Sequence, residues 1–528
     1  MNKIYLLSVF KRSLGSIAFL TITTVTMAQW SSTLNPYSQS AEATAMAIDE
    51  SGNIYSLGYA YKNSTEKENY LLVKYTPSGE IAWTKTCNIE AEDKAWSIAI
   101  ESSGNILVAG SSYRSGTNKD IAIIRYSSTG DSLGCYFYDG VNHLDDNVSN
   151  VLCESQNNIY FCGSTSFQGS LSGMVIGKLN ENLEKQWTRT YNADFYNGVT
   201  TDLFYSANLQ RVGITGYLKD YSGWAIMGTA IYDDAGNLQW SKSLRVDVEK
   251  PSLGYSLIIN SDGSTYVCGY ITHNSGWDAA LVKFNSTGDT LWTSCIMAGE
   301  SSFAYFNAQT TDATGNIYLT GMRGNNLLIA KINSDGDVMW SKEQPSGTFD
   351  KREMRYNIKL NSEGNIFVLG RSPLASGSTN IMLLKYSPEG ELIWQKNYKH
   401  LDNFNDAPMS MLLDDSGNIF ANATSTSASY YPEMTTFMLT GSAPSSISTN
   451  TEEKLNMYPN PANGKTWINA KHTGKATLQV FSIDGRLKHA DTMINDDYEL
   501  LLNGYQRGLY IVKVTAEGFT SSSLLMVQ

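Results

Sequence analysis

The chain has 528 residues, of which 42% are apolar and only 17% charged, so it is long enough for several domains or one large repeat array. Its formal net charge of −12 argues against a nucleic-acid partner, because phosphate binding depends on clustered Lys and Arg. The 32 Tyr, 11 Trp and 43 Gly, with only 11 Pro, predict an all-β chain of aromatic-rich strands joined by tight glycine turns.

The first 28 residues have the composition of an export signal. Basic residues precede an uncharged stretch from Leu14 to Met27, and the small residue Ala28 stands where a cleavage site is expected. The alternative is a membrane anchor, but an anchor needs about 20 apolar residues and this stretch is shorter and rich in Thr. We therefore predict a signal peptide at residues 1–28 and no transmembrane segment in the mature chain.

A segment of about ten residues recurs eight times from residue 49 onward. Its copies share a Gly-Asn-Ile core or a close variant and end in Gly or Ala. The strong copies are Asp49–Gly58, Glu101–Gly110, Glu154–Gly163, Asp312–Gly321, Ser362–Gly370 and Asp415–Ala423, and the weaker ones are Asn208–Gly216 and Ser261–Gly269.

Most copies are followed by a variable loop, a strand with a basic residue next to its end, a glycine turn and a strand that carries a tryptophan, for which the second copy has Leu133–Tyr136. Leu72–Tyr75, Gly79 and Trp83 show this order in the first copy. One unit is thus four short strands in about 52 residues, the period of a propeller blade. Because the Trp recurs in most units, we assign it to packing between blades rather than to function.

The eighth copy ends before its tryptophan strand, since the chain after Thr440 becomes a stretch of Ser, Pro and Thr. The missing strand is at the other end of the sequence, where Gln29–Leu34 resembles the Trp83 strand and Trp30 lies one period earlier. We therefore predict that the first strand after the leader completes the last blade and closes a ring over residues 29–440.

The repeated Gly-Asn-Ile-aromatic, Lys-Tyr and Gly-x-x-x-Trp elements resemble a bacterial β-propeller repeat family that is abundant in secreted proteins of Bacteroidota. The resemblance covers roughly residues 29–440. It implies four-stranded blades around a central axis. The family is named for seven blades, whereas the count here predicts an eight-bladed β-propeller.

After a polar linker at residues 441–454, a second unit occupies residues 455–528. Alternating strands and regular turns predict a small β-sandwich. The residues that distinguish this unit are Tyr458, Pro459, Asn460, Pro461, Gly485, Gly508 and Tyr510.

In their order and position, these residues resemble the type A sorting domain of the Bacteroidota type IX secretion system. The resemblance implies the type IX secretion machinery as a partner, and a secreted or outer-membrane cell-surface protein. This chain departs from the family at its end, which is Met526-Val527-Gln528 rather than basic residues. The alternative is an ordinary adhesive sandwich domain.

The sequence contains no recognisable motif for catalysis, cofactor binding or metal binding. The five His lack ligand spacing, and no nucleophile elbow, P-loop or dinucleotide glycine motif occurs. Acidic segments such as Asn333–Asp337 resemble calcium loops but lack the final Glu, so we interpret them as hairpin turns. We expect no cofactor, no metal and no enzymatic activity.

Six cysteines are too few to form the main scaffold. Cys153 and Cys162 flank one turn, so a bridge across that hairpin and buried free thiols are both open from the sequence.

In a ring of four-stranded blades, the second-to-third loops and the blade-to-blade connections share one rim. Aromatic and polar side chains there are candidates for stacking on sugars or gripping a peptide, or else they anchor the loops to the ring. The candidates for ligand binding are Tyr61, Tyr113, Tyr221, Trp224, His273, Trp277 and Arg323.

Three classes of function fit these features. A binding or adhesion module for glycan or extracellular protein predicts a solvent-open aromatic patch. A structural repeat protein without a discrete ligand site predicts a flat rim of small residues. A polysaccharide lyase or hydrolase needs two carboxylates, or a His, Tyr and Arg set, in the central funnel. The sequence favours the first class.

Overall fold

The computed structural model describes residues 24–25, 29–167, 171–191, 197–245, 250–273, 276–299, 303–346, 357–373, 378–400, 405–426, 431–440, 455–470, 475–482, 487–516 and 519–528. The chain divides into two compact units, residues 1–441 and 442–528. The described residues form strands and turns, and none of their segments is a helix long and apolar enough to cross a membrane. The predicted signal peptide and linker lie outside the described residues, apart from strand β1 (Thr24–Val25).

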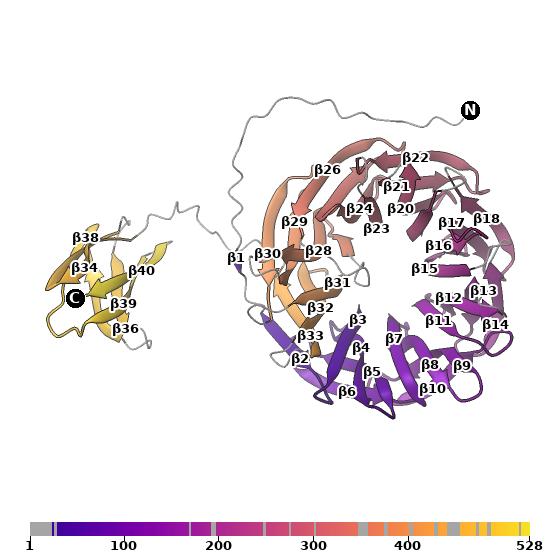
Figure 1. Ribbon diagram of the computed structural model, residues 1–528, viewed down its shortest axis with the longest axis horizontal. Helices are drawn as coiled ribbons and strands as arrows, with labels where there is room; N and C mark the ends of the chain where they lie inside the picture. Colours follow the sequence, from indigo (N-terminus) through magenta and orange to yellow (C-terminus); the bar gives the residue numbers. More distant parts are fainter. Residues whose placement is uncertain are drawn as a thin grey trace. The chain divides into compact units, whose positions relative to one another are not determined.

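In the first unit, the described residues form seven four-stranded sheets and one five-stranded sheet, arranged in a ring (Figure 1). The first sheet has the order β3 (Ser40–Ile48), β4 (Ile54–Asn63), β5 (Lys67–Tyr75) and β6 (Ile81–Cys87), and neighbouring strands are antiparallel. The first strand of a sheet lies near the central opening and the fourth at the outside (Figure 1). The predicted all-β propeller of four-stranded blades is confirmed, and the eight sheets are compatible with the predicted count of blades.

Six more sheets repeat this order. They are β7 (Ala91–Ile100), β8 (Ile106–Arg114), β9 (Asn118–Tyr126) and β10 (Ser132–Tyr138); β11 (Asp146–Cys153), β12 (Ile159–Phe167), β13 (Leu171–Leu179) and β14 (Lys185–Tyr191); β15 (Asn197–Ser206), β16 (Arg211–Lys219), β17 (Ala225–Asp233) and β18 (Leu238–Leu244); β19 (Ser252–Ile259), β20 (Thr265–His273), β21 (Gly276–Phe284) and β22 (Thr290–Ile296); β23 (Ala304–Thr311), β24 (Ile317–Arg323), β25 (Asn326–Ile332) and β26 (Val338–Pro345); and β27 (Asn357–Leu360), β28 (Ile366–Pro373), β29 (Thr379–Tyr386) and β30 (Leu392–Tyr398), where β1 adds in parallel to β30.

The eighth sheet joins the two ends of the ring. Its order is β2 (Trp30–Leu34), β33 (Pro432–Thr440), β32 (Asn418–Thr426) and β31 (Asp406–Leu413). Strand β2 runs antiparallel to β33 and places Trp30 opposite Met438. Strand β2 therefore completes the last blade, as the sequence predicts, and β33 is not left as an open edge.

The repeated tryptophan packs against the glycine turn of the following blade. Gly79 has φ +87°, and a Cβ there would lie 2.3 Å from the Trp30 ring, so glycine allows both the turn and the close approach. Trp83 likewise faces the turn at Gly130, and its indole N–H donates to Ser128 O (3.2 Å). The Trp residues therefore link neighbouring blades, and Trp30 does so across the closure.

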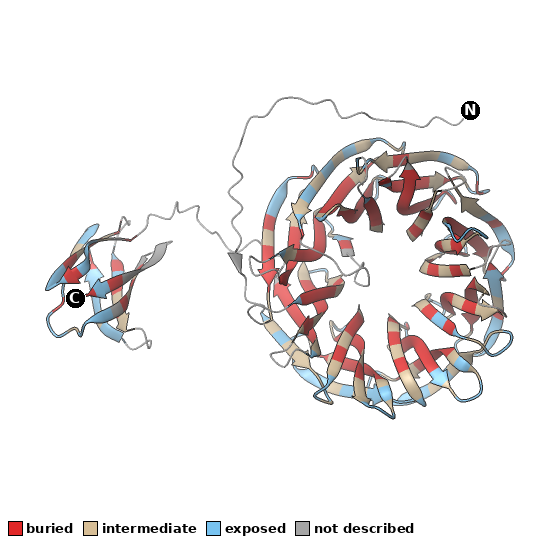
Figure 2. Ribbon diagram, viewed as in Figure 1, coloured by how far each residue is buried: buried red, intermediate tan, exposed pale blue. Residues whose placement is uncertain are grey.

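The repeated lysine also bridges blades. The Lys74 ammonium lies 5.1 Å from the centre of the Tyr55 ring in its own blade and donates to Ser128 O of the next blade (3.1 Å). Lys283 and Lys331 make the same two kinds of contact. Both repeated residues thus serve packing, and buried residues concentrate on the second and third strands of the blades (Figure 2).

In most blades, a glycine of the second strand lies opposite a shift of pairing register in the first strand. In the sixth blade the register shifts between Phe306 and Ala308, opposite Gly321. A Cβ on Gly321 would lie 1.9 Å from the backbone O of Tyr305. The glycine that ends the repeat is therefore required by the close approach of a neighbouring backbone.

All six cysteines are free thiols. Cys153 lies opposite Ile159 in the β11–β12 pair, whereas Cys162 lies opposite Asn150, so the two do not form a bridge across their hairpin. The acidic segment at Asn333 is a hairpin turn, because the Asn333 side-chain oxygen accepts the N–H groups of Asp335 and Asp337.

Buried aspartates near the start of three inner strands hold the connection that arrives from the preceding blade. In each case a carboxylate oxygen accepts a backbone N–H of the connection. Asp93 accepts that of Ile89 (2.7 Å), Asp146 that of Gly140 (2.6 Å) and Asp406 that of His400 (3.0 Å). Burial raises the pKa of Asp93 from 3.8 to about 6.

Replacing Asp93 by Asn should make the chain more stable at pH 7.5. A raised pKa in the folded state means that Asp93 favours folding below pH ~4 and that this contribution is lost as the pH rises through about 6. Asn keeps an acceptor for the Ile89 N–H without a charge, so we expect a gain of about 2 kcal/mol at pH 7.5 and almost none at pH ~4. Denaturant unfolding at both pH values measures the difference, and an equal effect at both would contradict it.

The second unit contains seven strands around its own core. They are β34 (Asn456–Asn463), β35 (Lys465–Asn469), β36 (Ala476–Ser482), β37 (Leu487–Met493), β38 (Asp497–Leu501), β39 (Gly508–Ala516) and β40 (Phe519–Val527). Strand β34 pairs with β35 on one side and, at Ala462, with Val527 of β40 on the other, so it belongs to both layers of the predicted sandwich. The side chains of Ile468, Leu478 and Val512 are fully buried between them.

Candidate ligand-binding site

The predicted ligand residues lie on one rim and are spread over five blades. Tyr61 is in β4, Tyr113 in β8 and Trp277 in β21, each beside a second-to-third loop, and Arg323 ends β24. Contacts such as Lys67 with Glu92 (3.3 Å) join these loops to the blade-to-blade connections, so both sets of loops share this rim.

Tyr221 and Trp224 belong to a turn after β16. Asp220 shapes this turn, because one of its carboxylate oxygens accepts the N–H groups of Ser222 and Trp224 (2.9 Å each). The Trp224 side chain is 42% exposed. His273 ends β20, but its side chain lies outside the described residues.

Trp277 belongs to a cluster of five aromatic residues across the fifth and sixth blades, which we call the aromatic patch: Tyr255, Tyr270, Trp277, Phe303 and Tyr305. The rings of Trp277 and Tyr270 are stacked, with centres 4.6 Å apart and planes inclined by 10°. Phe303 lies 6.4 Å from Trp277 and stacks on Tyr305 at 6.5 Å. The two exposed rings therefore each rest on a tyrosine, and the patch spans a blade boundary.

Tyr255 contacts both halves of the patch. Its ring lies 6.4 Å from that of Tyr270 and 5.7 Å from that of Tyr305. Tyr270 and Tyr305 are only 5% and 4% exposed, whereas Trp277 and Phe303 are 37% and 40% exposed. Burial, followed by the neighbouring Tyr217 phenol, raises the pKa of Tyr255 to about 12. The patch is therefore an uncharged platform with a buried base and two accessible rings.

The backbone fixes the exposed rings. Phe303 forms an isolated bridge with Trp277, and its carbonyl accepts the N–H of Gly324 (2.8 Å) from the β24–β25 turn. That turn carries Arg323, whose guanidinium donates to Glu343 (2.8 Å). Polar and charged groups thus stand beside the aromatic platform, which suits a ligand with both apolar faces and hydroxyl or amide groups.

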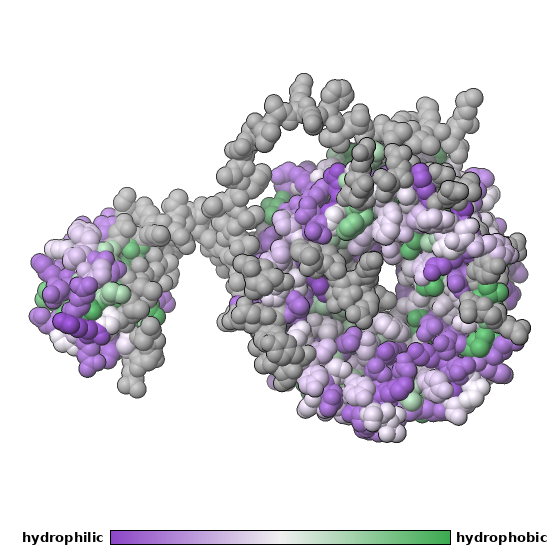
Figure 3. Space-filling model, in the orientation of Figure 1, coloured by the Kyte–Doolittle hydropathy of each residue, from purple (hydrophilic) through white to green (hydrophobic). Residues whose placement is uncertain are grey.

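Of the predicted ligand residues, the structure places Trp277 in the patch and Arg323 beside it. Tyr61, Tyr113, Tyr221 and Trp224 lie in other blades. Phe303 and Tyr305 were not among the predicted ligand residues, because their sequence pattern is that of the start of a core strand. In the view of Figure 3 the described ring surface is mostly hydrophilic, and apolar side chains form small separate patches.

In the second unit, the proline motif lies in β34 and contacts the end of the chain. Pro459 O accepts the Thr466 hydroxyl (2.9 Å), and the Asn460 side-chain oxygen accepts the N–H of Met526 (2.9 Å). Gly508 lies opposite Val527 at the start of β39, and the Tyr510 hydroxyl donates to Gln506 O (2.9 Å). Gly485 lies outside the described residues.

Residues 456–528 match the secretion system C-terminal sorting domain, and residues 101–131 and 260–290 match the β-propeller domain of unknown function DUF5122. The chain is a β-propeller protein with a type IX secretion sorting domain. The sorting domain indicates export and a secreted or cell-surface location, with the secretion machinery as its partner. The predicted resemblances are confirmed.

Solved structures resemble the chain at low identity and with TM-scores below 0.5. Sqt1 of Chaetomium thermophilum is 8% identical, with a TM-score of 0.48 over 77% of this chain and 97% of that one. Virginiamycin B lyase of Staphylococcus aureus is 12% identical, with a TM-score of 0.39 over 78% and 99%. A Dyadobacter fermentans protein of unknown function is 10% identical, with a TM-score of 0.35 over 79% and 99%. None of the curated proteins matches the chain. These likenesses carry no argument about the ligand of the propeller.

Proposed function

We propose that the propeller is a secreted or cell-surface binding module that takes a glycan on the aromatic patch. The observation that supports this function is the pair of exposed rings, Trp277 and Phe303, each stacked on a buried tyrosine. Aromatic rings held in place in this way lose little conformational freedom when a sugar face packs on them. Arg323 and Glu343, beside the patch, supply hydrogen-bonding groups for sugar hydroxyls.

The proposal includes export by two signals and assigns no catalytic step to the propeller. Residues 1–28 direct the chain to the periplasm, and the sorting domain takes residues 29–440 across the outer membrane. There are two alternatives to glycan binding: binding of an extracellular protein in adhesion, and a structural role without a ligand. The experiment described next distinguishes them.

Replacing Trp277 by Ala should weaken glycan binding by at least about tenfold, which corresponds to 1.4 kcal/mol. The reason is that the variant removes one accessible ring and exposes Tyr270 beneath it. The measurement is a glycan and extracellular-protein screen of the mature chain, followed by calorimetric titration with each hit. Phe303→Ala should have an effect in the same direction.

Trp224→Ala is the matched control, because Trp224 is equally exposed on the neighbouring blade but lies outside the patch. It should bind as the parent does. Equal binding by the parent and Trp277→Ala would remove the patch from the site. Hits among proteins alone would favour an adhesion partner, and no hit at all would favour the structural alternative.

A further inference from the structure

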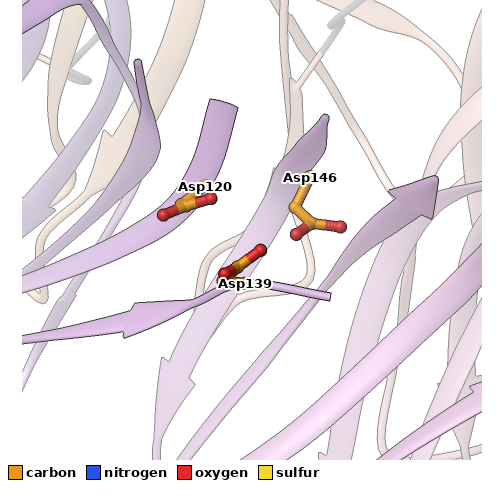
Figure 4. A group of neighbouring side chains, drawn as sticks. All are labelled: Asp120, Asp139 and Asp146. Carbon is orange, nitrogen blue, oxygen red and sulfur yellow. The ribbon is translucent and has the colours of Figure 1, made fainter. Parts of the chain in front are cut away.

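Three aspartates meet at the boundary between the second and third blades, away from the aromatic patch. Asp120 lies in β9, Asp139 directly follows β10, and Asp146 is the first residue of β11. One carboxylate oxygen from each residue lies within 4.8 Å of those of the other two. Figure 4 shows the three carboxylates turned toward a common space, each from a different segment of backbone.

Protein donors hold one oxygen of each carboxylate. Asp120 Oδ2 accepts hydrogen bonds from the Arg114 guanidinium (2.8 Å) and the Thr117 hydroxyl (2.9 Å). Asp146 Oδ2 accepts the backbone N–H of Gly140 (2.6 Å). These contacts fix the orientation of both side chains, as outer partners do for metal ligands.

One oxygen of Asp139 is held in the same way, because its Oδ2 lies 2.5 Å from His143 Nδ1. The second oxygen, Oδ1, of Asp120, Asp139 and Asp146 is buried and has no hydrogen-bond partner. Asp120 and Asp146 are 0% exposed. A buried carboxylate oxygen without a partner is costly, and three of them side by side call for a common ligand.

The charges around the cluster indicate which kind of ligand. Arg114 neutralises one of the three carboxylates, and the donor to Asp146 is an uncharged N–H. Excess negative charge in a buried space is relieved by a cation.

We propose that Asp120, Asp139 and Asp146 bind a divalent cation of the calcium type. Calcium takes oxygen ligands at about 2.3–2.6 Å, so oxygens on one ion stand at most about 5 Å apart, which accommodates the observed separation. Thr165 Oγ1 is a further buried oxygen beside Asp146.

Gly140 keeps this space open. A Cβ on Gly140 would lie 2.3 Å from Thr165 Oγ1 and 2.9 Å from Asp146 Oδ1. The ion joins β9 of one blade to β11 of the next and to the connection between them. It therefore adds a bond across a blade boundary on the rim.

The test is a calcium titration of the mature full chain at pH 7.5, by calorimetry and by thermal unfolding in EDTA, Ca²⁺ and Mg²⁺. The parent should bind about one Ca²⁺ with a Kd of about 10⁻⁴–10⁻³ M, the range of extracellular modules, and Mg²⁺ should bind more weakly. Asp120→Asn and Asp146→Asn should each raise the Kd at least tenfold, and Gly140→Ala should do so by filling the space.

Asp93→Asn is the matched control, because Asp93 holds the preceding connection in the same way but does not belong to the three-aspartate cluster. It should retain the calcium affinity of the parent. Asp139→Asn, at a partly exposed residue, provides a second variant if the buried ones do not fold. The proposal is overturned if 10 mM Ca²⁺ leaves the unfolding temperature of the parent unchanged, or if Asp139→Asn and Asp146→Asn bind Ca²⁺ as the parent does.

Discussion

A mature chain that starts at Asn35 instead of Gln29 should lose at least about 5 kcal/mol of stability and associate with other copies. Strand β2 supplies the backbone partners of β33, and each hydrogen bond contributes about 1 kcal/mol. Trp30 packs on Tyr75 (5.5 Å) and Phe420 (6.2 Å), and removing such a ring costs about 3 kcal/mol. Without β2, the unpaired groups of β33 also form a template for another chain.

Denaturant unfolding and light scattering after size-exclusion chromatography measure the two effects. Trp83→Ala is the control, because it removes the equivalent ring from the first blade, where it packs on Tyr55, and leaves all four strands in place. It should lower stability without association. The ring-closure account fails if the shortened chain is monomeric and as stable as the one that starts at Gln29.

The second large effect is expected at the glycine that ends the repeat. Gly321→Ala should destabilise the propeller by about 3 kcal/mol, because the new methyl group would lie 1.9 Å from the backbone O of Tyr305 and 2.7 Å from the Cα of Phe306. Backbone atoms of an inner strand cannot move aside without loss of the pairing between β23 and β24. Thermal or denaturant unfolding of the two chains measures the difference.

Gly370→Ala is the matched control in the seventh blade. The nearest atom to its Cβ would be Leu327 Cδ2 at 3.0 Å, the end of a side chain that can rotate, so we expect a loss below about 1 kcal/mol. The eighth blade already has Ala423 at this place, opposite Pro408. Equal losses from Gly321→Ala and Gly370→Ala would show that the backbone approach is not the reason for the glycine.

The fold was predictable because its determinants are local and repeated. Most units carry a turn glycine and a Trp, and the copy of that Trp at position 30, one period before Trp83, predicts the closure of the ring. The sorting domain was predictable for a similar reason, since Tyr458 to Pro461 form a compact motif close to the end of the chain.

The candidate site was predictable only in part. Trp277 was a candidate because it follows a loop. Phe303 belongs to the next blade and resembles a core residue in the sequence, and only the arrangement of the blades brings it next to Trp277. The carboxylate cluster was not predictable for the same reason. Asp120, Asp139 and Asp146 have no ligand spacing in the sequence and meet only because β9 and β11 lie in adjacent blades.

The pairing of Trp30 with Met438 makes assembly of the ring depend on the whole chain. Strand β2 cannot pair until its partner β33, the last strand of the propeller, has been synthesised. Contacts between residues so far apart in the sequence form slowly. A chain cut anywhere before β33 has nothing to receive β2 and exposes an unpaired strand. The topology therefore restricts ring closure to chains that include β33, which is the last strand before those of the sorting domain.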